Sequence, residues 1–87
     1  PTAAPARLAA PPGPYELRPW QRGDRMRPLR LKGRSRKLSD LYGAAKVPRI
    51  LRATARVLVR TTDATIVWAE HLGGAFDEPS SVVPEPA

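Results

Sequence analysis

The chain is 87 residues long, enough for one small domain, and carries a formal net charge of +7. It has no cysteine and one histidine, which excludes disulfides and thiolate metal sites and leaves too few ligands for zinc. No signal-peptide pattern and no apolar run long enough to cross a membrane is recognisable, so we expect a cytoplasmic protein with no membrane contact.

Both ends of the chain are rich in proline and poor in large apolar side chains. Residues 1–14 hold five of the eleven prolines, which is typical of an extended linker. Residues 77–87 hold three prolines and three acidic residues, which predicts a disordered acidic tail. We therefore expect the fold within residues 15–76. Since the chain does not begin with Met and opens like an interdomain linker, it is interpreted as a terminal module of a longer protein.

The positive charge is concentrated in one part of the sequence. Residues 18–60 contain fourteen of the fifteen Lys and Arg residues and two Asp residues, a net charge of 14 − 2 = +12. Such one-sided charge attracts polyanions, and the planar fork of arginine binds phosphate with two hydrogen bonds and stacks on bases. The pattern favours a nucleic-acid partner over a basic surface that only increases solubility.

The first two predicted elements are short strands. Residues 15–20 alternate apolar and polar side chains, so Tyr15, Leu17 and Trp20 should face the core, and Pro19 restricts this strand to an edge or an end.

A connector follows, in which Gly23 can take a positive φ. Residues 25–29 should form a second short strand, with Met26 facing inward and Pro28 ending it.

A Gly- and Arg-rich loop over residues 31–36 leads to a predicted helix that ends near Lys46, with Ser35 as its N-cap. Apolar side chains at positions i, i+3, i+4 and i+7 define its core face, namely Leu38, Leu41, Tyr42 and Ala45.

Three cations lie at the start of this helix: Arg34, Arg36 and Lys37. Because unpaired backbone N–H groups and the positive end of the helix dipole also lie there, we predict a phosphate site at this point. Acidic side chains would have stabilised the helix more, which also points to a functional reason for the cations.

Pro48 predicts a second helix, because proline favours the first helical position. Its apolar side should consist of Val47, Ile50, Leu51 and Thr54. The opposite side carries only positive charge, from Arg49, Arg52 and Arg56, and so predicts a second phosphate-contacting patch.

Residues 56–61 and 65–69 are rich in β-branched side chains and predict an antiparallel hairpin with a turn of three to five residues. The Gly73-Gly74 pair is expected to end the ordered part. Taken together, the elements predict a small α+β domain, a short antiparallel sheet with two helices packed on it.

No catalytic motif is found. His71 stands beside Glu70, but no nucleophile or second orienting acid accompanies the pair, so a surface histidine is the preferred interpretation. Gly33 and the basic residues after it lack the spacing of a phosphate-binding loop.

Short motifs in a fixed order, GDRMRPL, KLSDL, VPR and a hairpin ending IVW, resemble the C-terminal domain of bacterial tRNA(Ile)-lysidine synthetase. The resemblance covers about residues 17–72. The residues that match the family pattern are Gly23, Asp24, Arg25, Arg27, Pro28, Leu29, Lys37, Leu38, Asp40, Val47, Pro48, Arg49, Arg52, Ile66 and Trp68. The chain departs from the pattern at Arg30, Arg56 and Ala69-Glu70-His71, which concerns the edge and turn geometry of the hairpin.

The resemblance implies a parent enzyme that uses ATP to join lysine to the wobble cytidine of an isoleucine tRNA. That chemistry, with ATP and lysine, belongs to an N-terminal domain whose SGGxDS motif is absent here, so no catalytic residue, cofactor or metal is expected in this chain. The resemblance assigns to this module the binding of tRNA in its acceptor-stem region, which orients the substrate for the catalytic domain.

Nine basic residues are predicted to contact RNA: Arg25, Arg27, Lys32, Arg34, Arg36, Lys37, Arg49, Arg52 and Arg56. Two alternatives are kept. The basic face could meet an acidic protein surface, either the catalytic domain of the parent enzyme or a second copy in a homodimer. The chain could also be a free-standing, general RNA-binding protein.

Overall fold

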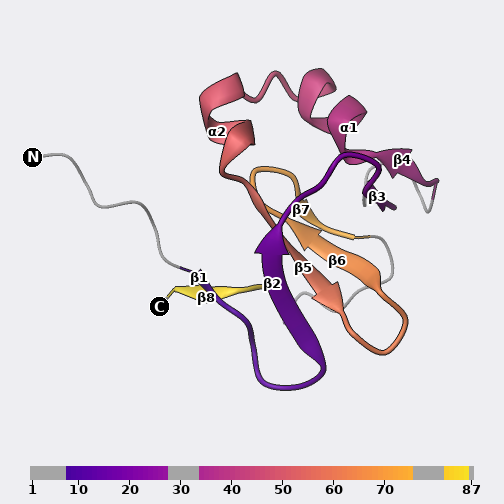
Figure 1. Cartoon of the computed structure of the whole chain (residues 1–87), viewed down its shortest axis with the longest axis vertical. Coiled ribbons are helices and arrows are strands. Elements are labelled where there is room, and N and C mark those ends of the chain that lie inside the picture. The colour runs from indigo at the N-terminus through magenta and orange to yellow at the C-terminus, as the bar shows by residue number, and fades with distance from the viewer. Residues whose placement is uncertain (1–7, 28–33, 76–81, 87) are drawn as a thin grey trace, which may run out of the picture.

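Residues 8–27, 34–75 and 82–86 are described by the computed structural model, and the largest sheet in these parts has the strand order β2–β5–β6–β7 (Figure 1). The elements of this sheet are β2 (Tyr15–Pro19), β5 (Arg56–Arg60), β6 (Thr65–Ala69) and β7 (Gly73–Gly74). The other elements of the domain are β3 (Arg25–Met26), β4 (Arg36–Lys37), α1 (Leu38–Ala44) and α2 (Arg49–Ala53). The α+β fold predicted from the sequence, an antiparallel sheet with two helices, is confirmed.

The hairpin and the edge strand follow the sequence pattern. Strands β5 and β6 are antiparallel and are joined by residues 61–64, within the predicted turn length. Strand β2 pairs with β5 at the edge of the sheet, and Pro19 is its last residue, where the missing N–H costs no interior ladder bond. Gly23, in the connector after β2, has the predicted positive φ of 95°.

Gly73 and Gly74, which were expected to end the ordered part, form strand β7. His71 takes a φ of 71° and the N–H of Leu72 donates to the carbonyl of Ala69, so the chain reverses directly after β6. The two glycines then pair with Trp68 and Ala69. Their pairing needs only backbone groups, so the lack of side chains did not prevent it.

Residues from the two ends of the chain also pair. Strand β1 (Leu8–Ala9) lies antiparallel to β8 (Glu85–Pro86). The proline-rich composition did not predict this pairing. Boundaries at residues 14 and 77 remain predictions.

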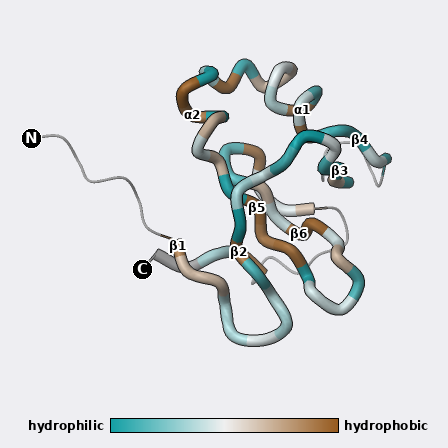
Figure 2. Tube along the Cα trace, viewed as in Figure 1, coloured by the Kyte–Doolittle hydropathy of each residue, from teal (hydrophilic) through white to brown (hydrophobic). Residues whose placement is uncertain are grey.

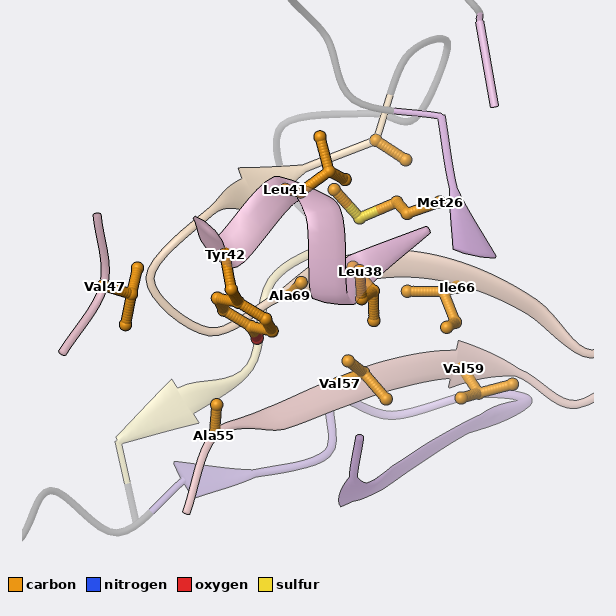
Figure 3. Packing of buried hydrophobic residues seen from close by; sticks show 11 residues of the cluster. Met26, Leu38, Leu41, Tyr42, Val47, Ala55, Val57, Val59, Ile66 and Ala69 are labelled. Carbon is orange, nitrogen blue, oxygen red and sulfur yellow. The ribbon is translucent and has the colours of Figure 1, made fainter. Parts of the chain in front are cut away.

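Helix α1 packs on the sheet as its periodicity predicts. Leu38, Leu41 and Tyr42 are buried, and Figure 3 shows their side chains in the cluster that also contains Val57 and Ile66.

Tyr42 also bonds the helix to the end of β6 through its hydroxyl, which donates to the backbone carbonyl of Glu70 at 2.9 Å. Burial, aided by the charge of Glu70, raises the pKa of Tyr42 to about 12. Ala45 was wrongly placed in the core: the helix ends at Ala44, Lys46 takes a φ of 56°, and Ala45 is exposed.

Helix α2 is oriented differently from the helical-wheel prediction. Ile50 is 78% exposed and Leu51 is 45% exposed, and Figure 2 shows this apolar segment on the outer side of the molecule. Arg52 is half-buried instead, and its guanidinium donates to the carbonyl of Val47 at 3.0 Å.

Trp20 holds the five-residue helix α2 in place, although the apolar side chains of this helix do not pack on the core. Its indole N–H donates to the carbonyl of Arg52 at 2.6 Å, and its backbone N–H donates to the carbonyl of Ala55 at 3.2 Å. The Trp20 ring packs beside Tyr42, with the ring centroids 5.3 Å apart. The end of α2 is thus anchored to the core through its backbone.

Candidate nucleic-acid interface

Basic side chains gather on the two-stranded pair of β3 and β4. We call this pair, with the adjoining Arg27, Arg34 and Ser35, the basic ribbon. It lies beside α1, on the opposite side of that helix from α2 (Figure 1). Met26 is 3% exposed and anchors the ribbon in the core. The remaining side chains of the ribbon are exposed to solvent: Arg25, Arg27, Arg34, Ser35, Arg36 and Lys37.

The pairing of the ribbon brings like charges together. Arg25 lies directly opposite Lys37, so their side chains project from the same face of the strand pair. Two like charges in directly opposed positions destabilise a sheet. In the described parts of the chain, no ion pair is formed by any of the five ribbon cations, whereas Arg18, Arg56 and Arg60 are paired with carboxylates. Among the described residues, no carboxylate therefore compensates the positive charge that the ribbon presents to solvent.

Asp24 holds the start of the ribbon in place. Its carboxylate accepts hydrogen bonds from both terminal nitrogens of Arg18, at 2.9 and 3.1 Å, and from the backbone N–H of Gln21 at 2.7 Å. Its backbone carbonyl accepts from the N–H of Leu38 at 2.9 Å, which ties the connector before β3 to the first residue of α1. Partial burial would raise the pKa of Asp24, but the bonds from Arg18 and Gln21 outweigh it, and the pKa is lowered.

Changing Asp24 to Asn should lower the free energy of unfolding by about 1 kcal/mol at pH 7, because the carboxamide cannot pair with Arg18 and the pair is partly screened by solvent. Since the folded-state pKa of Asp24 is lowered, the stabilisation is fully present above the ordinary carboxyl pKa of about 3.9 and is lost progressively as the pH falls from there through the lowered folded-state pKa. Urea unfolding of both proteins at pH 7 and pH 3 measures the difference. A difference of equal size at both pH values would contradict the ion pair.

Ser35 was predicted to be the N-cap of α1, and this prediction was wrong. The N-cap residue is Lys37, which makes no capping bond through its side chain, because residues 36 and 37 are drawn into strand β4. The Ser35 hydroxyl accepts a hydrogen bond from Nε of Arg25 at 3.1 Å, and its carbonyl accepts from a terminal nitrogen of the same arginine at 3.3 Å. The cations predicted to surround a helix N-terminus therefore belong to a strand pair.

The structure brings only part of the predicted RNA-contacting set together. Arg25, Arg27, Arg34, Arg36 and Lys37 share the ribbon. Arg49 is exposed at the start of α2, apart from them, and Lys32 lies outside the described residues.

The remaining two predicted residues are only half-exposed. Arg52 points toward Val47, and Arg56 lies 3.9 Å from the carboxylate of Glu70. A continuous cationic face along α2 is therefore not formed.

Sequence reasoning missed a hollow of about 540 Å³ between the ribbon and the β5–β6 turn. Arg60 and Asp63 belong to its lining, and Arg60 donates to both carboxylate oxygens of Asp63 at 3.1 and 2.9 Å. The hydrogen bond from Arg60 lowers the pKa of Asp63 to about 2. The sequence could have indicated the ion pair of Arg60 and Asp63, because the two opposite charges are three residues apart at a predicted turn.

The described residues form neither a metal site nor a membrane-spanning helix. Within residues 8–27, 34–75 and 82–86, no group of three His, Cys, Asp or Glu side chains is close enough to hold a metal ion. None of the helices in the described parts combines the length and apolar composition needed to cross a bilayer.

Comparison with known proteins finds one family. A family model described as the TilS substrate C-terminal domain matches residues 15–80 of the chain. No curated protein and no solved structure matches.

Proposed function

The chain belongs to the TilS substrate C-terminal domain family, the C-terminal domain of tRNA(Ile)-lysidine synthetase, and from this premise we propose that its basic ribbon binds tRNA. The ribbon would hold the substrate in its acceptor-stem region while a separate catalytic domain, using ATP and lysine, modifies the wobble cytidine. The module itself would contribute affinity and orientation, and no chemical step.

One observation carries the proposal: Arg25 and Lys37 are directly opposed in the ribbon, although like charges destabilise a strand pair. A bound polyanion removes this repulsion, because phosphate oxygens between the two side chains accept hydrogen bonds from both. The departure from local stability is expected at a site that serves binding.

The ribbon cations are suited to contacts with the phosphate backbone. They stand on an exposed strand pair and its flanks, where long side chains can follow a curved phosphate backbone. Contacts of this kind position a nucleic acid without reading its sequence, which fits a module that orients a substrate for another domain.

A protein-docking role is the second candidate, favoured by the exposure of Ile50 and Leu51 on α2. Ile50 and Leu51 are adjacent, and contiguous exposed apolar surface is a feature of protein interaction sites. The two roles use opposite sides of α1, so both surfaces could serve one parent enzyme at the same time.

Titration of the ¹⁵N-labelled 87-residue chain with tRNA distinguishes the two surfaces. We expect the backbone amide signals of residues 25–27 and 34–37 to shift, and those of residues 50–53 to stay in place. Shifts confined to α2, or no shifts at all, would contradict tRNA binding by the ribbon.

A further inference from the structure

We propose that the hollow between the basic ribbon and the β5–β6 turn binds one unpaired nucleotide of the RNA. The inference rests on the proposed tRNA-binding function and adds a second mode of contact to it. The ribbon cations would hold the phosphate backbone of a paired region, and the hollow would take a single base that no longer stacks in a helix.

The hollow has the volume of a small-molecule site. Its volume of about 540 Å³ lies in the range of roughly 300 to 1,000 Å³ that is typical of ligand pockets. Four separate segments of the chain contribute its lining: Arg25, Met26, Arg27, Ser35, Arg60, Asp63, Ala64, Thr65, Ile66 and Ala75.

Apolar side chains form the base of the hollow. Met26 and Ile66 both line it and both belong to the buried core cluster, so their positions are fixed by packing (Figure 3). A planar nucleobase can lie against such a surface, and the thioether of Met26 makes favourable contacts with aromatic rings.

Arginines form the rim, and two of them are held in fixed orientations. Arg60 is bound through two hydrogen bonds to Asp63, and Arg25 is bound through two to Ser35. A guanidinium whose plane is already fixed can stack on a base with little further loss of entropy. Arg27 makes no hydrogen bond or ion pair within the described parts of the chain, so it can bind the phosphate of the same nucleotide.

Stacking of a base in the hollow favours an unpaired nucleotide. In a duplex, both faces of each base are covered by neighbours, so the rim arginines could reach only backbone and groove edges. Proteins that stack side chains on RNA bases do so in single-stranded loops, bulges and ends, where the base can turn out. The hollow therefore points to an unpaired nucleotide at an end or a bulge of the bound RNA.

The test compares RNA hairpins that share one stem and are closed by a non-nucleotide linker, so that the closed end offers no unpaired base. The open end is blunt, has a 3′ overhang or has a 5′ overhang, and a fourth form carries a one-nucleotide bulge in the stem. Binding to the unaltered 87-residue chain is measured by fluorescence anisotropy. Because stacking of one base contributes about 1–3 kcal/mol, at least one unpaired form should bind about tenfold tighter than the blunt hairpin. The RNA form with the higher affinity shows whether the bound nucleotide comes from a 3′ end, a 5′ end or a bulge.

A variant that fills the hollow adds an independent test. Thr65 is exposed and lines the hollow, and tryptophan favours strands, so Thr65→Trp should remain folded and block the site. It should abolish the tenfold gain and leave the affinity for the blunt hairpin unchanged. Thr62→Trp, in the turn before β6 and outside the lining, is the control and should keep the gain.

Two results would overturn the inference while leaving the proposed function intact. One is equal affinity of the unaltered chain for blunt and unpaired forms. The other is a folded Thr65→Trp protein that still shows the full gain. Failure of the chain to bind any of the hairpins would overturn both the inference and the proposed function.

Discussion

Replacing Arg36 and Lys37 together with glutamine should weaken tRNA binding by roughly 30-fold. Each exposed cation on β4 is expected to contribute about 1 kcal/mol through one phosphate contact, and 1.4 kcal/mol corresponds to a factor of ten. Glutamine keeps most of the length and polarity of the side chain and removes the charge. Both side chains are exposed and neither forms an ion pair in the described parts of the chain, so the circular dichroism spectrum should not change.

The chain offers a control of the same composition in Lys46 and Arg49, one lysine and one arginine that are exposed near the start of α2. Changing both to glutamine lowers the net charge by the same amount. We expect less than a threefold loss of affinity, because these residues lie apart from the ribbon. Equal losses for the two double variants would show that net charge, and not the ribbon, determines binding.

Replacing Leu38 with alanine should lower the free energy of unfolding by about 3 kcal/mol. The Leu38 side chain is fully buried where α1 meets the sheet, and truncation of such a leucine removes packing and leaves a cavity. In a small domain this is a large part of the total stability, so unfolding should begin at much lower urea concentrations. Urea titration followed by circular dichroism measures the change.

Leu51 provides the matched control, because the same substitution there removes a side chain that is 45% exposed. Leu51→Ala should change the stability by about 0.5 kcal/mol or less. The pair also separates two accounts of α2. If Leu51→Ala proved as costly as Leu38→Ala, the helix would pack through the apolar side predicted from its periodicity, and the observed orientation would be contradicted.

The elements that were predicted well have patterns that extend over several residues. The β-branched runs predicted the β5–β6 hairpin, and the apolar spacing of Leu38, Leu41 and Tyr42 predicted how α1 packs. In both elements, the burial of apolar side chains decides which face packs on the core. The spacing of apolar residues in the sequence therefore predicts the orientation of the element.

The failures lie where backbone bonds between distant segments decide the structure. A helical wheel assumes a helix long enough to be oriented by its apolar face, whereas the five residues of α2 are anchored through the carbonyl of Arg52 to Trp20. Strand β4 consists of an arginine and a lysine, with no alternation that could reveal it. It pairs with β3 across ten to twelve residues of sequence, from Met26–Arg36 to Arg25–Lys37, which no local pattern indicates.

The candidate site was recovered in part for the same reason. The density of positive charge in the sequence was enough to predict the cations of the ribbon as surface residues. Charged side chains are usually exposed to solvent, whatever path the backbone takes. Charge density could not show that Arg52 turns toward Val47, or that Arg60 and Asp63 meet the ribbon across a hollow. These relations need the three-dimensional arrangement of segments that are far apart in the sequence.

The dependence of tRNA affinity on salt concentration tests the central claim most directly. If about four phosphates are neutralised by the five cations of the ribbon, a plot of the logarithm of the association constant against that of the salt concentration should have a slope near −3 to −4. The Arg36→Gln and Lys37→Gln double variant should reduce the magnitude of this slope by about two. A slope near zero for the unaltered chain would contradict binding through the ribbon.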